Sequence, residues 1–323
     1  MHLKKLLIKS ISTLCLFFCT TLTYAQNGYP NKPIHLTVPF APGQVTDWLA
    51  RFVGEQMSQE LGQPVLIENR AGANGVVGNS YAVRQPADGY NLVISSNGTH
   101  AAAPSTTQNL GYDPIKDFSH IIGLMSLPWA LTVRDDFPAK NFEEFLTYVR
   151  ANPGKLTTGY GSVSSRLCIH LLRTMGKLDF LDIPYKSLGQ TIIDLRGGSL
   201  QFSFLDIGSA ITQAKGGALR VLAVSSEASS EALPSAPPIG QFLPGYQMTS
   251  WLALSAPAGT PQPIIDRLQR VIELIMSRAD TQNKIANYGG KIMTASGTQL
   301  VDIIQSESKV WADFAKDAGV SKE

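Results

Sequence analysis

Hydrophobic and polar positions follow two alternating periods in the N-terminal third of the chain. Residues 33–40 (PIHLTVPF) are mostly apolar and β-branched, which predicts a strand, and residues 45–62 carry apolar side chains at helical spacing up to Gly62, which predicts a helix. Residues 64–70 and 91–96 repeat the strand pattern with a helix-like segment between them. This order predicts βαβ crossovers and a mostly parallel sheet covered by helices. The stripe of the first helix consists of Val45, Trp48, Leu49, Phe52, Val53 and Met57.

The middle third repeats this alternation, which predicts a second α/β lobe. Helix-like segments that end in or near glycine interleave with short apolar strands. The segment 231–247 is rich in proline and aperiodic, and we interpret it as a surface connection. Apolar positions spaced for a helix return near the C-terminus, from Leu300 to Phe314. The expected helices are 142–154, 165–175, 190–198 and 208–217, and the expected strands are 181–186, 200–206 and 219–226.

The length and the first 25 residues indicate an exported protein of two lobes. With 323 residues, 44% of them hydrophobic and 16% charged, the chain exceeds one typical domain. Residues 1–25 combine a basic start with an apolar run too short to span a membrane, which predicts a signal peptide cleaved after Ala25 and a periplasmic location. Cys15 and Cys19 lack the small preceding residues of a lipoprotein site, so a soluble protein is expected.

The charge balance and the cysteine content indicate which partners and which covalent bonds the mature chain can have. Cleavage removes three of the 27 basic residues and leaves 24 against 25 acidic ones, so the mature chain is near neutral and gives no indication of nucleic-acid binding. Only Cys168 survives cleavage, which excludes a disulfide within the mature chain, and we expect it to fill a helix face. We expect a monomer without cofactor or metal.

Motifs of the large enzyme classes are absent or weak. The chain has no phosphate-binding G-x-x-x-x-G-K-[ST] and no G-x-S-x-G elbow, and GANGVVG (72–78) matches the dinucleotide fingerprint only loosely. The histidines lack zinc-ligand spacing, and His170 has the apolar neighbours of a packed or interface residue. One catalytic alternative stays open, in which His100 with Ser95 or Ser96 and Asp47 assembles a hydrolase triad.

Three loops could hold a small anion. They are FAPGQVTD (40–47), SSNGTHAAAP (95–104) and GYGSVSSR (159–166), and each connects a strand-like segment or a turn to a helix start. In open α/β sheets ligands bind beyond the carboxyl ends of strands, and helix N-termini offer unpaired N–H groups and a partial positive charge. Two or three such loops in one place would favour a small anion, although each alone could be only a well-capped turn.

Phrases along most of the chain identify a family resemblance. YPNKPIHLTVPFAPGQVTDWLAR, ENRAGANGVVGNSYAVRQPADGYNLVISSNGTHAAAPS, IPYKSLGQTIIDLRGGSLQFSFLD and PGYQMTSWLALSAPAGTP closely resemble the tripartite tricarboxylate transporter substrate-binding family, the Bug or TctC-like periplasmic receptors. The resemblance implies an α/β, two-lobed type II periplasmic binding protein with two crossover strands and a cleft between the lobes. It implies a receptor, not an enzyme, that takes a small carboxylate and delivers it to a membrane permease. Lobe one would comprise 26–127 and 228–323 and lobe two 128–227, with crossovers near 129–134 and 219–225.

The same resemblance implies a set of ligand-binding positions. Phe40, Tyr160 and Trp251 would be aromatic walls of the cleft, which makes an aromatic acid one option. Two positions depart from the family pattern: Gln44 stands where a second glycine is frequent, and Arg166 where many members have histidine. Arg166 either binds a carboxylate with its planar fork or is a structural residue that pairs with an acid or caps a loop. The expected ligand residues are Phe40, Ala41, Gly43, Gln44, Thr46, Ser96, Asn97, Gly98, Tyr160, Ser162, Ser164, Arg166 and Asp206.

Two alternatives to a transport receptor remain at this stage. A binding module that feeds a sensor or scavenges ligand would have the same pocket and no permease. A periplasmic hydrolase would need the triad around His100.

Overall fold

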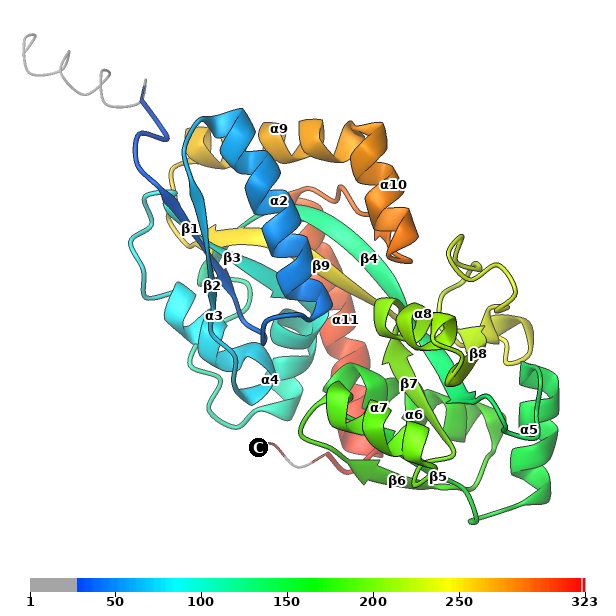
Figure 1. Ribbon diagram of the computed structural model, residues 1–323. Coiled ribbons are helices and arrows are strands. Elements are labelled where there is room, and N and C mark those ends of the chain that lie inside the picture. Colours follow the sequence, from blue (N-terminus) through cyan, green and yellow to red (C-terminus); the bar gives the residue numbers. More distant parts are fainter. Residues whose placement is uncertain (1–27, 321, 323) are drawn as a thin grey trace, which may run out of the picture.

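The computed structural model describes residues 28–320 and residue 322, and Figure 1 shows two α/β lobes side by side. The predicted signal peptide and its cleavage after Ala25 lie outside the described residues. Among the helices of the described part, none combines the length and the apolar character that a membrane span requires. One strand, β4 (Phe118–Arg134), runs from one lobe into the other.

The partners of β4 divide it between the two lobes. Its residues up to Pro128 pair with β9 (Thr249–Pro257), whereas from Trp129 onward it pairs with β7 (Phe202–Asp206) and β8 (Leu219–Val224). The strand order is β2-β1-β3-β9-β4-β7-β5-β6, and β10 and β8 add to β4. A strand of 17 residues was not expected from the sequence. Its apolar run has no period and is defined only by pairing with distant strands.

Lobe one contains the predicted βαβ units. Its three N-terminal strands are parallel, as expected, but β9 and β10 run antiparallel to their neighbours, so the sheet is mixed. The two faces of β3 show why the strands are mostly apolar: Leu92 and Ile94 point into the cluster under α2 and α9, and Val93 points into the cluster on the opposite face. The further elements are β1 (Ile34–Val38), α2 (Val45–Leu61), β2 (Val65–Asn69), η1 (Ala73–Gly75), α3 (Val76–Ala82), β3 (Asn91–Ser96), η2 (Gly98–Ala102), α4 (Ala103–Thr106), α9 (Gln262–Ser277), α10 (Ala279–Asn287) and β10 (Lys291–Ile292).

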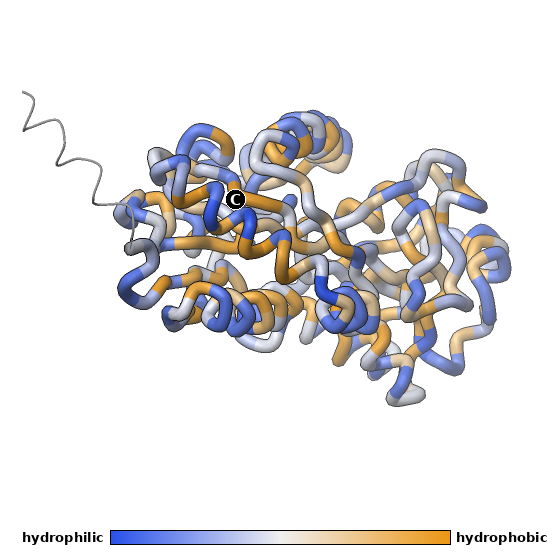
Figure 2. The backbone as a smooth tube through the Cα atoms, turned by 90° about the horizontal axis from the view of Figure 1, so that it is seen from above, coloured by the Kyte–Doolittle hydropathy of each residue, from blue (hydrophilic) through white to orange (hydrophobic). Residues whose placement is uncertain are grey.

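The predicted stripe of α2 forms part of the lobe-one core. Leu49, Val53 and Met57 are fully buried there, and the helix ends at Gly62, whose φ of 68° is the left-handed C-cap conformation. Figure 2 shows the same division along the backbone, with hydrophobic positions concentrated on the central strands and hydrophilic ones on the outer segments. Burial of such apolar faces stabilises each lobe by about 25 cal/mol per Å² removed from water.

Lobe two has its own sheet and core. Strands β5 (Thr157–Tyr160), β6 (Leu181–Pro184) and β7 are parallel, and each is followed by a helix. Cys168 fills a buried helix face, as expected, and is a free thiol. Strand β5 was missed because it is short and polar and begins with two threonines. The helices of this lobe are α5 (Phe142–Ala151), α6 (Val163–Gly176), α7 (Leu188–Gly197) and α8 (Ile207–Lys215).

The proline-rich segment 231–247 is more than a surface connection. Tyr246 is 2% exposed in the lobe-two core, and its hydroxyl donates to the carbonyl of Cys168 at 2.9 Å. Ile239, Leu243 and Met248 lie in the same cluster, with η3 (Ile239–Gln241) inside the segment. Because this packing joins 239–248 to lobe two, we propose that the chain returns to lobe one near 248 and not at 228.

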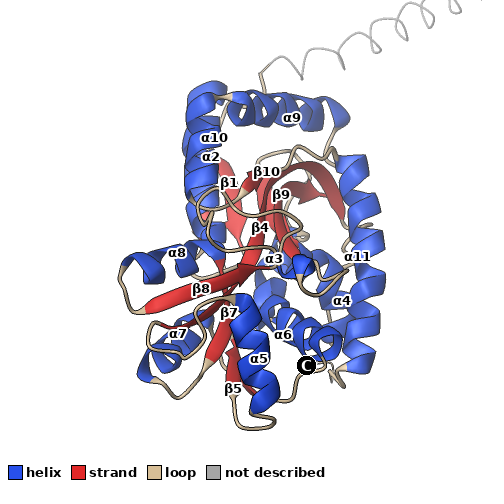
Figure 3. Cartoon of the chain, turned by 90° about the vertical axis from the view of Figure 1, so that its right-hand side faces the viewer, coloured by secondary structure: helices blue, strands red, loops and turns tan. Residues whose placement is uncertain are grey.

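The C-terminal helix α11 (Gly297–Asp317) packs on both lobes. Leu300 and Ile304 lie against Trp251 of β9 in lobe one, and Trp311 and Phe314 are buried in the lobe-two core. Figure 3 shows α11 running down the side of the molecule opposite α2. The helix is therefore a third connection between the lobes, beside β4 and the segment before β9.

Candidate functional site

A hydrogen-bond network fixes the first predicted loop. Asn69 donates its Nδ2 to the carbonyl of Phe40 at 3.1 Å and to Oδ1 of Asp47 at 2.9 Å. Asp47 also accepts the backbone N–H of Gly43 at 2.9 Å and pairs with Arg51. Burial raises the pKa of Asp47, but the hydrogen bonds from Arg51, Gly43 and Asn69 more than offset this effect and hold the pKa below its ordinary value. The loop is therefore held by Asn69 at Phe40 and by the ionised carboxylate of Asp47 at Gly43.

This network leaves the first turn of α2 available to a ligand. The N-cap residue Gln44 makes no side-chain capping bond, although its carbonyl accepts from Trp48. Gln44 is exposed and Thr46 is buried, and Gly43 adopts φ 84°, which favours glycine. The first N–H groups of an α-helix have no intrahelical partner, so this end of a 17-residue helix offers N–H donors and the positive end of the helix dipole.

The second predicted loop follows β3 and carries an unpaired donor. The hydroxyls of Ser96 and Thr99 bond each other at 3.2 Å and each accepts the backbone N–H of the other residue, which closes a tight turn at the start of η2. Asn97 is 2% exposed, and within the described part of the chain its Nδ2 has no hydrogen-bond partner. A buried donor without an acceptor costs about 1–3 kcal/mol, so Asn97 is a position where an acceptor from a ligand would be favourable.

The hydrolase triad considered from the sequence is not assembled. His100 Nδ1 lies 2.9 Å from Oγ1 of Thr99, whereas Asp47 bonds to Gly43, Arg51 and Asn69 and not to His100. Ser95 bonds Ser255 instead of a histidine. The hypothesis was wrong because sequence proximity to SSNGT says nothing about where the Asp47 carboxylate points.

The third predicted loop is a capped turn that presents Arg166. Ser162 caps α6 by accepting the N–H of Ser165 at 3.2 Å, and Ser165 bonds back to the N–H of Ser162. A Cβ at Gly161 would overlap the backbone of Ser187, so this position requires glycine. The sequence had placed the helix start near Arg166, but α6 begins at Val163.

Arg166 itself is partly buried and has no carboxylate partner among the residues that the structure describes. Its guanidinium lies 5.2 Å from the centre of the Tyr160 ring, a cation–π distance that orients its fork. The structural alternative, in which Arg166 pairs with an acid of its own chain, is therefore not realised here. Ser164, two residues earlier on α6, is buried.

Asp206 ends β7 and caps α8. Its Oδ1 accepts the N–H of Ser209 at 3.0 Å, and the side chain is partly buried. Burial raises the pKa of Asp206, against the opposing effect of hydrogen bonds from Ser209 and Gly208. No cation pairs with this carboxylate among the described side chains.

Contacts between elements bring the loops of the two lobes together. Helix α6, which carries Arg166, packs against η2, which begins directly after Asn97. A Cβ at Gly75 would lie 3.1 Å from Cζ of Phe40, so the first loop also adjoins the turn before α3. At the other end, Gly208 of α8 contacts the ring of Tyr288, which stacks on Trp48 of α2 at 4.3 Å.

Two residues near the loops were not predicted from the sequence, Asn69 and Tyr288. Asn69 and Tyr288 lie far from the loops in sequence, and only the fold places them beside Phe40 and Gly208. For Asn69, its place at the carboxyl end of β2 was an available signal, because ligands in α/β sheets bind at that edge. Tyr288 gave no such signal.

Trp251 is not a wall of the ligand site. It is 3% exposed beneath α11, and its Nε1 donates to Glu307 at 2.9 Å. The prediction failed because a tryptophan near a strand start is as suitable for a core as for a cleft. Phe40 and Tyr160 remain partly exposed.

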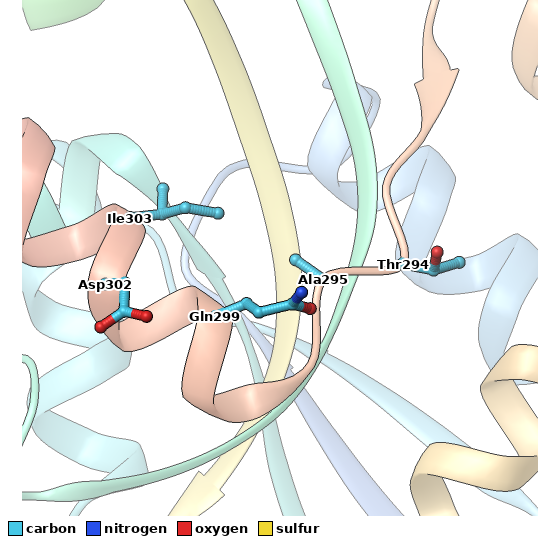
Figure 4. A pocket seen from close by; sticks show the side chains of 5 residues that line it. All are labelled: Thr294, Ala295, Gln299, Asp302 and Ile303. Atoms are coloured by element: carbon cyan, nitrogen blue, oxygen red, sulfur yellow. The ribbon is translucent and has the colours of Figure 1, made fainter.

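An open pocket of about 490 Å³ lies elsewhere, at the start of α11. Figure 4 shows its lining side chains, which come from the first turns of α11 and the segment before it: Thr294, Ala295, Gln299, Asp302 and Ile303. None of these residues belongs to the three predicted loops.

Comparison with known proteins agrees with this fold. The sequence profile of the family described as "Tripartite tricarboxylate transporter family receptor" (TctC) matches residues 49–320. Protein BugT of Bordetella pertussis is 29% identical over 303 residues, which cover 91% of this chain and 92% of BugT.

Two solved structures of similar proteins contain a dicarboxylic acid. Rpa4515 of R. palustris with adipate has a TM-score of 0.85 at 28% identity and covers 91% of this chain and 100% of that one. MatC from Rhodopseudomonas palustris with bound malate has a TM-score of 0.77 at 28% identity and covers 88% and 99%. The chain thus has the two-lobed α/β fold of the periplasmic binding proteins, and it belongs to the tripartite tricarboxylate transporter receptor family.

Proposed function

We propose that this protein is a periplasmic receptor, not an enzyme, that binds a small carboxylate between its lobes and delivers it to a tripartite tricarboxylate-type permease. One observation carries the proposal: donors that have no partner within the described part of the chain stand on both lobes beside one seam. Lobe one contributes the uncapped N-terminus of α2 and the buried Nδ2 of Asn97, and lobe two contributes Arg166. Donors that lack acceptors and a cation that lacks a carboxylate favour an anion with several oxygen atoms.

The two lobes would divide the ligand between them. The turn at Phe40–Gln44 and the residues Ser96, Asn97 and Gly98 offer neutral donors, which suit a carboxylate that is held without a full ion pair. Arg166 would bind a carboxylate with two parallel hydrogen bonds, each worth about 1.5–3 kcal/mol where water is excluded. Asp206, an acceptor when ionised, would take a hydroxyl or amino group. The adipate and malate held by two relatives are small acids of this kind.

Export, cleavage after Ala25 and a monomeric state are part of this proposal. They rest on the basic and apolar pattern of residues 1–25 and on the family to which the chain belongs. Mass spectrometry of the protein from a periplasmic extract should find Gln26 as the N-terminus, and light scattering of that sample should give the mass of one chain. An uncleaved N-terminus in that extract would refute the cleavage after Ala25 alone.

The test of binding is a thermal-shift screen. The panel contains malate, adipate, other dicarboxylates, aromatic acids, amino acids and neutral nicotinamide-like compounds. A bound ligand at one hundred times its Kd raises the free energy of unfolding by about 2.7 kcal/mol. We expect shifts from one class of acids and none from the neutral compounds, and shifts from neutral compounds alone would contradict the proposal. Co-purification of a cross-linked permease, or its absence, separates a transport receptor from a binding module that serves a sensor.

A further inference from the structure

Helix α8 packs against lobe one as well as against lobe two. Ile207 and Ile211 lie in the lobe-one core with Ile285 of α10, and Ile207 and Ile285 are fully buried. On its other side, Ala210 packs with Ala130 and other residues of lobe two. Figures 1 and 3 both show α8 directly below α10. Helix α8, which Asp206 caps, therefore lies in a seam that both lobes share.

Two glycines allow the close approach of this seam. A Cβ at Gly208, in the first turn of α8, would overlap the ring of Tyr288 and lie 2.7 Å from its hydroxyl oxygen. A Cβ at Gly289 would lie 2.7 Å from Cγ1 of Ile207, and the φ of 89° at this residue independently favours glycine. Tyr288 and Gly289 thus form a seat on which the start of α8 rests.

The ring of Tyr288 also contacts α2, the helix that follows the first predicted loop. Tyr288 stacks on Trp48 with ring centres 4.3 Å apart and planes 20° apart, and Trp48 stacks on Phe52. The pKa of Tyr288 is raised by burial and by the nearby negative charge of Asp206, which places these two side chains in one electrostatic neighbourhood. A chain of contacts therefore runs from α2 through Trp48 and Tyr288 to the start of α8.

We propose that Tyr288 is a positioning residue for ligand binding, because its ring sets the place of the Asp206 end of α8 relative to α2. This inference rests on the proposed function, in which Asp206 and the N-terminus of α2 receive parts of one ligand. Without the ring, the first turn of α8 loses its seat and the distance between these two groups is no longer fixed. Ligand binding would then weaken without loss of any side chain that touches the ligand.

The first test needs no ligand. Hydrogen exchange of a peptide covering 205–212 is measured in the full chain and in variants. We expect Tyr288→Ala to accelerate exchange at least fivefold and Tyr288→Phe, which keeps the ring, to change it less than twofold. Gly208→Ala should accelerate exchange as Tyr288→Ala does. In the double variant Gly208→Ala/Tyr288→Ala the added Cβ meets no ring, so its exchange should be no faster than that of either single variant. Gly197→Ala is the matched control, since a Cβ there meets nothing within 4 Å.

The second test uses whichever acid of the screen stabilises the wild-type protein. Tyr288→Ala should weaken its binding at least fivefold, and adding Asp206→Asn should weaken it little further, whereas adding Arg166→Ala should show its full separate effect. Three results would each overturn the proposal. Exchange in Tyr288→Ala could equal that of the wild type, or Tyr288→Phe could accelerate exchange as much as Tyr288→Ala does. The effects of Tyr288→Ala and Asp206→Asn on binding could also be additive. If no acid binds the wild type, the proposed function fails, and the exchange result still decides whether Tyr288 positions α8.

Discussion

Glu307 offers a direct test of how burial acts in this protein. Its carboxylate, on the helix that joins both lobes, accepts Nε1–H of Trp251 at 2.9 Å. Burial raises its pKa from 4.5 to about 7, against the opposing effect of the Trp251 hydrogen bond. Since the pKa is higher in the folded state, the folded protein holds the proton more tightly than the unfolded chain. This tighter binding adds to the free energy of unfolding, and the added stability is fully present below pH 4.5 and lost as the pH rises to about 7. A shift of this size corresponds to about 3 kcal/mol.

Glu307→Gln should remove that loss, because glutamine keeps an oxygen that can accept from Trp251 and carries no charge. We expect the variant to exceed the wild type by about 1–3 kcal/mol in free energy of unfolding at pH 8 and to match it at pH 4.5. Urea denaturation followed by circular dichroism at both pH values measures the difference. The control is Glu273→Gln, an exposed residue that accepts from Gln269, where no pH-dependent difference is expected. A destabilised Glu307→Gln variant at pH 8, or a difference independent of pH, would refute the reasoning.

Two further predictions concern acid stability and the first loop. His120, which contacts Ser255 and the carbonyl of Pro114, has a pKa lowered to about 4 by burial. Its contribution to the free energy of unfolding is therefore fully present above pH 6.5 and lost as the pH falls to about 4. In the Glu307→Gln background His120 alone should therefore lower the free energy of unfolding by about 3 kcal/mol between pH 7 and pH 4. His100, whose pKa burial also lowers, should add to this loss, and a flat urea profile would exclude both effects. Asn69→Ala removes the bonds to Phe40 and Asp47 and the bond accepted from Arg51, and it should accelerate hydrogen exchange in 40–44 severalfold. Asn91→Ala, which removes only a bond to Pro86 and one to Asp88, should not reproduce this effect.

The elements that sequence analysis predicted are those whose pattern is local. Helix α2 was readable because its stripe, its Gly62 cap and its length all agree. Strand β4 was not, because its 17 residues show no regular alternation and include Gly123 and Pro128, and its identity comes from pairing with β9, β7 and β8. Likewise Tyr246 lies in a proline-rich segment that looks like a loop, yet distant contacts bury it.

For the site, the sequence indicated the loops and not their connections. The turns before α2 and η2 lie where they were expected, since glycine, serine and asparagine mark strand-to-helix turns, whereas α6 begins at Val163, before the expected start near Arg166. The bonds of Asn69 to Phe40 and the stack of Tyr288 on Trp48 depend on how sheet and helices pack. The same dependence explains why Trp251 was assigned to the wrong place.

The most direct test of the central claim is a calorimetric titration of Arg166→Ala with the acid that the screen selects. Wild-type protein and Arg150→Ala, an exposed arginine on α5, serve as controls. If Arg166 binds a carboxylate between the lobes, its removal should weaken binding at least tenfold, about 1.4 kcal/mol, with the melting temperature nearly unchanged. Equal affinity in Arg166→Ala and the wild type would contradict the account.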